Sequence, residues 1–220
     1  MALHPEGIFT SGPLFQLVGL AAGPGDALEW EVLRLNRILL TEHWDPRWRH
    51  PLQPLASQLD YMAVTFTDAF FDSCPPAARA VWTAAAGDRT VPAFMTDLAL
   101  LLRLADREGE PDYDAVPLAR WEAEARFPLL RDLDLWAYLG EHDSFDSAFQ
   151  ERIDGEHPLC DRELVPIVTQ ALQALALCER STAFTTAFHA YAPAAAPATL
   201  EVVVELGQAH MAEHHRTRPA

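Results

Sequence analysis

The chain has 220 residues and no lysine, and it sets 16 arginines against 32 aspartates and glutamates, for a net charge of −16 at pH 7. A field of that sign repels nucleic acids and anionic membranes, so the composition argues against direct binding to either. No run reaches the roughly 18 apolar residues of a membrane span, and three widely spaced cysteines predict neither a disulfide framework nor a cysteine-only zinc site. These features predict a cytoplasmic protein.

Apolar residues recur at helical spacing along most of the chain, and no sustained alternation of β-branched residues predicts a sheet. We therefore predict an all-α fold, a compact multi-helix bundle of about nine or ten helices that forms a single domain over residues 1–220. The first predicted helix covers residues 26–41. A connector rich in proline follows it, and the second predicted helix carries apolar residues from Leu59 to Phe70.

Two further helices are predicted over residues 76–86 and 90–105. The stretch Asp106–Asp114 holds five acids against one arginine together with a glycine and a proline, which predicts a solvated loop. If the chain has two lobes, their division falls near residues 106–116.

The second half of the chain contains the longest clean apolar stripe, from Leu164 to Cys178, which predicts a buried central helix. Between Asp132 and Glu156, eight acids stand against a single arginine, the strongest concentration of negative charge in the sequence. The helices predicted in this half cover 117–127, 128–139, a segment capped by Ser144, 166–180, 182–192, and a segment that runs from a Thr199 cap to the C-terminal histidines.

A metal site is indicated by two histidines near the C-terminus. His210 and His214 are one helical turn apart, so one face of a helix offers both imidazoles to a divalent metal. A third ligand has to come from elsewhere, and the candidates are His43 and His50. The alternative is that histidines in a last turn interact only with the helix dipole. Cys160 lies three residues after His157 in an acidic loop, where we expect a solvated histidine and no catalytic thiol.

A surface for a basic protein partner is indicated by two groups of residues. Acidic side chains are complementary to a cationic surface and raise the rate of association, while tryptophans in a locally basic connector are typical of interface hot spots. The residues of this predicted surface are Asp132, Asp134, Glu141, Asp143, Asp146, Trp44 and Trp48.

Two functions of different classes follow from these patterns. The first is a regulatory, neutralising or adaptor protein that binds a basic macromolecule through its acidic surface. The alternative is a helical-bundle metal-dependent enzyme or small-ligand-binding protein that uses the C-terminal histidines. The sequence leaves open whether the protein is an enzyme and whether it forms oligomers.

Overall fold

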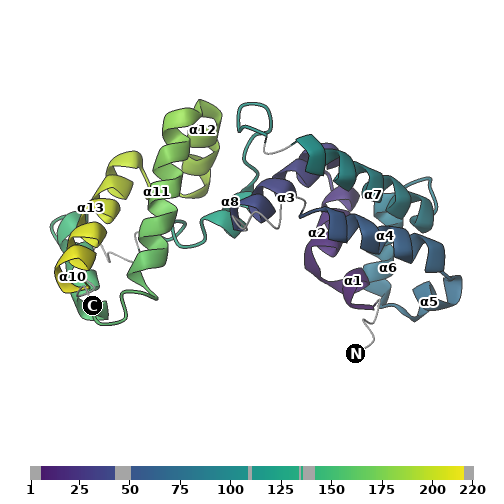
Figure 1. The fold of residues 1–220 in the computed structure, drawn as a ribbon, viewed down its shortest axis with the longest axis horizontal. Helices are drawn as coiled ribbons and strands as arrows, with labels where there is room; N and C mark the ends of the chain where they lie inside the picture. The colour runs from purple at the N-terminus through teal and green to yellow at the C-terminus, as the bar shows by residue number, and fades with distance from the viewer. Residues whose placement is uncertain (1–5, 43–50, 109–110, 134, 136–141, 216–220) are drawn as a thin grey trace, which may run out of the picture. The chain divides into compact units, whose positions relative to one another are not determined.

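The computed structural model describes residues 6–42, 51–108, 111–133, 135 and 142–215. All regular structure in these residues is helical, which confirms the all-α prediction (Figure 1). The described residues form twelve helices where nine or ten were predicted. Their bounds are α1 Glu6–Thr10, α2 Gly12–Ala22, α3 Leu28–Glu42, α4 Gln53–Thr65, α5 Asp68–Ser73, α6 Pro76–Ala86, α7 Val91–Glu108, α8 Arg120–Arg126, α10 Phe145–Glu156, α11 Leu164–Arg180, α12 Thr182–Tyr191 and α13 Pro197–His214.

Two of the additional helices lie at the start of the chain, where the sequence predicted none. Helix α2 has Ser11 at its N-cap and a proline in its first turn, which are common at helix starts, but the Ser11 side chain makes no capping hydrogen bond and the first turn holds no acid. Gly12, with φ at 81°, turns the chain between α1 and α2. Burial of apolar side chains such as Phe9 and Leu17 decides the conformation here.

A further difference is that the helix predicted across Leu59–Phe70 is divided in two. Helix α4 ends at Thr65, and the Thr67 hydroxyl accepts a hydrogen bond from the backbone N–H of Phe70 at 3.2 Å. That bond is the N-cap of α5, so a threonine inside the expected helix starts a new one.

Three other boundaries also differ from the prediction. Helix α13 begins at Pro197, after an Ala196 N-cap, so Thr199 lies inside the helix and does not cap it. Residues 128–132 form turns where a helix was predicted, and most of the rest of 128–139 lies outside the described residues. The Ser144 cap is confirmed, because its side chain accepts the backbone N–H of Ser147 at 3.2 Å.

The chain divides into two compact units, residues 1–111 and 112–220. The boundary falls within the stretch 106–116 in which the sequence allowed a division. However, Asp106 was predicted to lie in a solvated loop and is instead buried inside α7. Its carboxylate accepts the buried backbone N–H of Leu52 at 3.1 Å. The Asp106 carboxylate therefore satisfies the hydrogen-bonding need of a buried backbone N–H just before α4.

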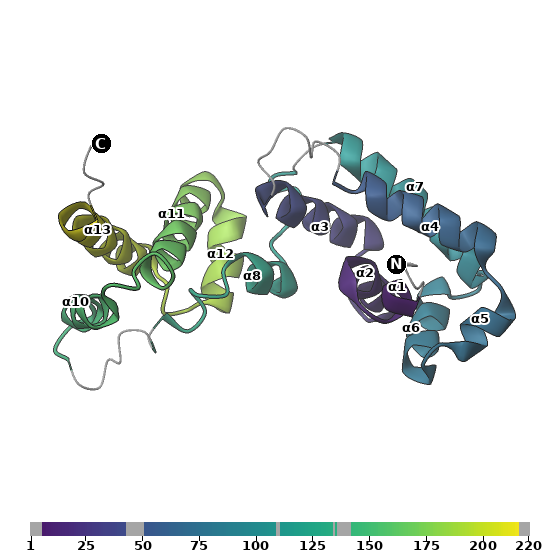
Figure 2. The ribbon, with the colours of Figure 1, turned by 60° about the horizontal axis from the view of Figure 1, so that its bottom comes forward.

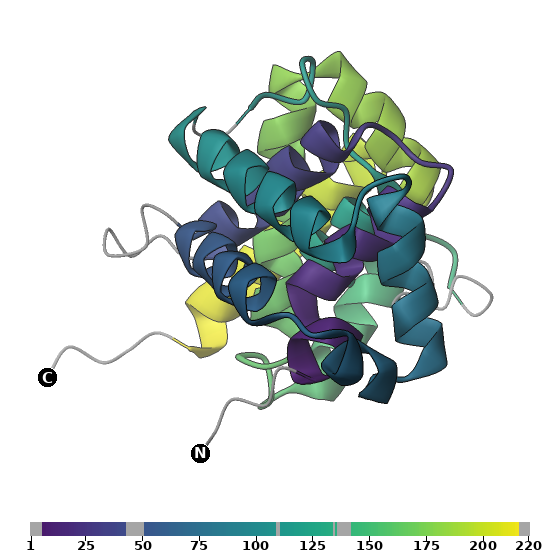
Figure 3. The ribbon, with the colours of Figure 1, turned by 90° about the vertical axis from the view of Figure 1, so that its right-hand side faces the viewer.

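The first unit packs around the aligned pair α4 and α7, which lie side by side in Figure 3 (blue and teal). Helix α6 adds Trp82, which is fully buried; its ring centroid lies 4.8 Å from that of Phe9. The Trp82 indole N–H donates to the backbone carbonyl of Phe9 at 3.2 Å. The aromatic core thus ties α6 to the N-terminal helices.

The second unit is built on the contact between α11 and α13 (Figure 2). Gly207 of α13 lies so close to α11 that a Cβ at this position would come within 2.4 Å of Val168 Cγ2. Helix α10 also packs on α13, and the buried stripe of α11 is confirmed, although Leu172 within it is exposed. None of the described helices is both long enough and apolar enough to cross a membrane.

Candidate metal centre

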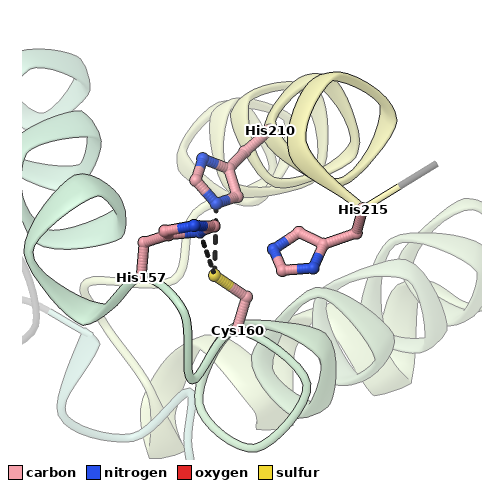
Figure 4. A group of neighbouring side chains, drawn as sticks. All are labelled: His157, Cys160, His210 and His215. Atoms are coloured by element: carbon pink, nitrogen blue, oxygen red, sulfur yellow. Dashed lines mark hydrogen bonds between the residues drawn. The ribbon is translucent and has the colours of Figure 1, made fainter.

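Four side chains converge at one end of the second unit: His157, Cys160, His210 and His215. Figure 4 shows them pointing toward one another, two from the loop between α10 and α11 and two from α13. One donor atom from each lies within 4.8 Å of the donor atoms of the other three. Three histidines and one cysteine thus form a group of potential metal ligands within the part of the chain that the structure describes.

The loop between α10 and α11 fixes the first two of these residues. His157 is the C-cap residue of α10. A tight turn follows, in which the N–H of Leu159 donates to the carbonyl of Glu156 at 2.8 Å. The carbonyl of Cys160 then accepts the N–H groups that open α11, at 3.0 and 2.9 Å. The backbone of this loop is therefore fixed at the end of α10 and at the start of α11.

Helix α13 supplies the other two residues. His210 is buried on the same face as Val203 and Gly207, the face that packs on α11. His215 is the C-cap residue, and its backbone N–H donates to the carbonyl of Met211 at 3.1 Å. The close approach of α13 to α11 at Gly207 brings both imidazoles to the loop residues.

The spacing of the donor atoms suits a tetrahedral ion. The Cys160 sulfur lies 3.1 Å from His210 Nε2 and 3.6 Å from His157 Nδ1. Tetrahedral zinc, with bonds of about 2.3 Å to sulfur and 2.0–2.1 Å to nitrogen, separates neighbouring donors by about 3.3–3.6 Å. The two distances from the sulfur are near these values, and the whole group, whose donor atoms lie within 4.8 Å of one another, would draw closer around an ion.

A second observation supports a ligand at this place. The Nε2 atom of His215 is buried and has no hydrogen-bond partner among the described residues. A buried imidazole nitrogen without a partner is costly unless something binds it. Cys160 is fully buried and His210 is 6 % exposed, so the two inner ligands are shielded from water.

The protonation state of His210 is also suited to metal binding. Burial lowers the pKa of His210 below the ordinary value of an imidazole, and the neighbouring His214, His157 and His215 lower this pKa further, against a smaller opposing effect of Asp154. The lowered pKa favours the neutral ring, which has a lone pair to donate to a metal ion.

Nearby negative charge favours a cation at this site. The C-terminal ends of α10 and α13 both reach the group through their C-cap residues, and each carries the partial negative charge of the helix dipole. Asp154 Oδ1 also lies 4.0 Å from His210 Nδ1, on the side of the ring opposite the sulfur. At 4.0 Å this carboxylate is too far to hydrogen-bond the ring, but it adds negative charge beside the group.

A different use of the Cys160–His210 pair would be nucleophilic catalysis by an activated thiolate. That chemistry requires a sulfur that substrate can reach. Cys160 has no exposed surface, and His157 and His215 occupy the space around it. The arrangement is therefore better suited to hold an ion than to attack a substrate.

The histidines predicted from the sequence have different positions in relation to this site. His210 belongs to the group of four. His214 lies beside it, with its ring centroid 4.7 Å from that of His210, and is not one of the four. His43 and His50 lie outside the described residues, so the structure does not test them as ligands.

Sequence reasoning missed His157, Cys160 and His215. The expectation of a solvated histidine is confirmed, since His157 is exposed, but Cys160 in the same loop is fully buried. The spacing of His157 and Cys160, with two residues between the ligands, is common in metal sites and was the available signal.

The predicted partner surface is only partly visible. Asp132, Asp143 and Asp146 are exposed. The other residues assigned to it lie outside the described part of the chain: Asp134, Glu141, Trp44 and Trp48.

Comparison of the chain with protein families, with curated proteins and with solved structures finds no match.

Proposed function

We propose that this protein binds one zinc-class divalent metal ion through His157, Cys160, His210 and His215. The observation that carries the proposal is the convergence of four donor atoms within 4.8 Å of one another, together with the buried Nε2 of His215, which has no hydrogen-bond partner among the described residues. A thiolate with three imidazoles suits zinc, whereas magnesium and calcium prefer oxygen ligands. The ion would join the C-terminal ends of α10 and α13 to the start of α11.

Four protein ligands favour a binding or regulatory role over hydrolysis. Catalytic zinc usually keeps one coordination position open for water, and structural zinc does not. Here the four side chains are enough to complete a tetrahedron. We therefore place the protein among metal-binding proteins and do not assign it to the hydrolases.

The test is the metal content of an untagged chain. After removal of metal with a chelator and titration with Zn²⁺, the wild type should bind one ion per chain, measured by elemental analysis. His210→Ala should bind none at the same free Zn²⁺ concentration. His189→Ala, which removes an exposed histidine of α12, serves as the matched control. An unmodified chain that retains no more zinc than His210→Ala would refute the proposal.

A second candidate function is binding of a basic protein. It is favoured by the net charge of −16 and by the exposure of Asp132, Asp143 and Asp146. Neutralising all three as asparagines should weaken capture of a basic partner, and capture by the wild type should fall steeply between low and high salt. Binding that does not depend on salt would count against this function.

A further inference from the structure

The metal centre has a fifth imidazole. His214 follows His210 by one turn on the same face of α13, and the ring centroids of the two lie 4.7 Å apart. The His214 ring is also 5.4 Å from that of His157, the same separation that His157 has from His210. His214 therefore neighbours two of the proposed ligands.

Burial differs sharply across this set of side chains. Cys160 is fully buried and the His210 side chain is only 4 % exposed, whereas 44 % of the His214 side chain is exposed. His157 is also exposed. His157 and His214 thus form an outer, exposed pair of potential metal ligands, and Cys160 and His210 form an inner, buried pair.

Carboxylates stand near the outer side of the group. Glu213 Oε2 lies 3.9 Å from His214 Nε2, and Asp154 lies beside His210 with its side chain 62 % exposed. Fixed negative charges at the mouth of a site raise the local concentration of cations. The outer imidazoles are therefore placed where an arriving ion first concentrates.

We infer that His214 is a transfer ligand, the side chain through which the ion passes between solvent and the four-ligand site. This inference rests on the proposed function. An ion bound by four protein side chains leaves slowly if all its bonds must break before a new one forms. A fifth imidazole within reach replaces one ligand at a time and lowers that barrier. The centre would then exchange its ion readily, as a site that responds to metal supply needs to do.

A transfer ligand has a specific kinetic signature. It speeds loading and release by the same factor, because both directions pass through the same intermediate. Removing it slows both rates and leaves the stoichiometry at saturation unchanged. Removing one of the four holding ligands instead reduces the amount of ion bound.

The experiment uses the full chain loaded with Zn²⁺ and follows its release to the chromogenic chelator 4-(2-pyridylazo)resorcinol by stopped flow. His214→Gln should still bind one ion at saturation and release it about tenfold more slowly, which corresponds to a barrier to release that is about 1.4 kcal/mol higher. His214→Glu, which restores a metal-binding side chain, should recover much of the wild-type rate. His189→Gln should behave as the wild type.

Several results would overturn the inference. Unchanged rates in His214→Gln would show that the ion does not pass through this residue. Loss of the bound ion in that variant would make His214 a holding ligand. Slow release in His189→Gln as well, or no recovery in His214→Glu, would trace the effect to something other than ligation. A wild-type chain that binds no Zn²⁺ would refute the proposed function itself, which the saturation measurement reports before any rate is taken.

Discussion

At the scale of single residues, the centre depends on a sulfur and an imidazole that are both removed from water. A buried thiol beside a neutral imidazole gains only a weak hydrogen bond, because sulfur is a poor donor. The same two groups bound to a zinc-class ion gain two coordinate bonds, and the ion compensates the burial of a thiolate. Cys160 is consequently the residue whose chemistry changes most when metal binds.

The first prediction concerns that sulfur. Cys160→Ser should lower the affinity for Co²⁺ by more than the roughly 10–100-fold that loss of an outer-shell partner costs, because a hydroxyl is a far poorer ligand than a thiolate. The near-ultraviolet thiolate-to-cobalt charge-transfer band of the wild type should disappear. Cys178→Ser, which alters a half-buried cysteine of α11, is the control and should keep the band. If the band survived in Cys160→Ser, the sulfur would not be a ligand.

At the scale of helices, the position of α13 against α11 decides whether the ligands meet. Val168 is β-branched and therefore stiff in a helix, so it cannot easily turn away from a side chain added at position 207. Gly207 is thus the residue that permits the close contact of the two helices.

We predict that Gly207→Ala destabilises the protein although alanine is the better helix former. Overpacking costs about 1–3 kcal/mol, and the gain in helix propensity of about 1 kcal/mol offsets only part of it. Urea denaturation followed by circular dichroism measures the net loss. In a Val168→Ala background, where the clashing methyl is gone, the same change should be neutral or stabilising. Equal losses in both backgrounds would contradict the proposed contact.

A second prediction at this scale concerns the junction of α7 with α4. Asp106→Ala removes the acceptor for the buried N–H of Leu52, and an unsatisfied buried donor costs about 1–3 kcal/mol. Asp97→Ala is the matched control on the same helix, since its 2.8 Å ion pair with Arg89 is exposed and such pairs contribute at most about 1 kcal/mol. Urea midpoints that shift equally in the two variants would argue against a structural role for Asp106.

At the scale of the whole molecule, the metal centre belongs to only one of the two compact units. All four proposed ligands lie in residues 112–220, and the first unit has its own core around Trp82. An ion that binds only the folded state stabilises the part of the protein that must unfold to release it. The stabilisation is about 2.7 kcal/mol when the free ion concentration is a hundred times Kd.

Hydrogen exchange should therefore report a localised effect of metal. Addition of Zn²⁺ to the full chain should slow amide exchange in peptides from α10, α11 and α13, because their opening breaks the site. Peptides from α4 and α7 should exchange at unchanged rates. His210→Ala provides the control and should show no protection anywhere. Equal protection in both units would contradict a site confined to the second.

Sequence patterns determined the helical class and several helix positions, because apolar spacing, caps and prolines act within a few residues. The Ser144 cap, the end of α6 at residue 86 and the stripe of α11 are such local signals. The same reasoning put His210 and His214 on one face of the last helix, and of these only His210 belongs to the group of four. It failed at α1 and α2, where it predicted no helix, and at Asp106, whose partner Leu52 is 54 residues away.

Only the tertiary structure decided the membership of the candidate site. His157 and Cys160 are separated from His210 by about fifty residues, and a distance of that kind is set by how α13 packs on α10 and α11. The one-residue difference between His214 and His215 is likewise beyond helical periodicity, because the helix ends at His214 and its C-cap turns the next side chain inward. Local sequence specifies the helices, and the packing of their faces specifies which side chains meet.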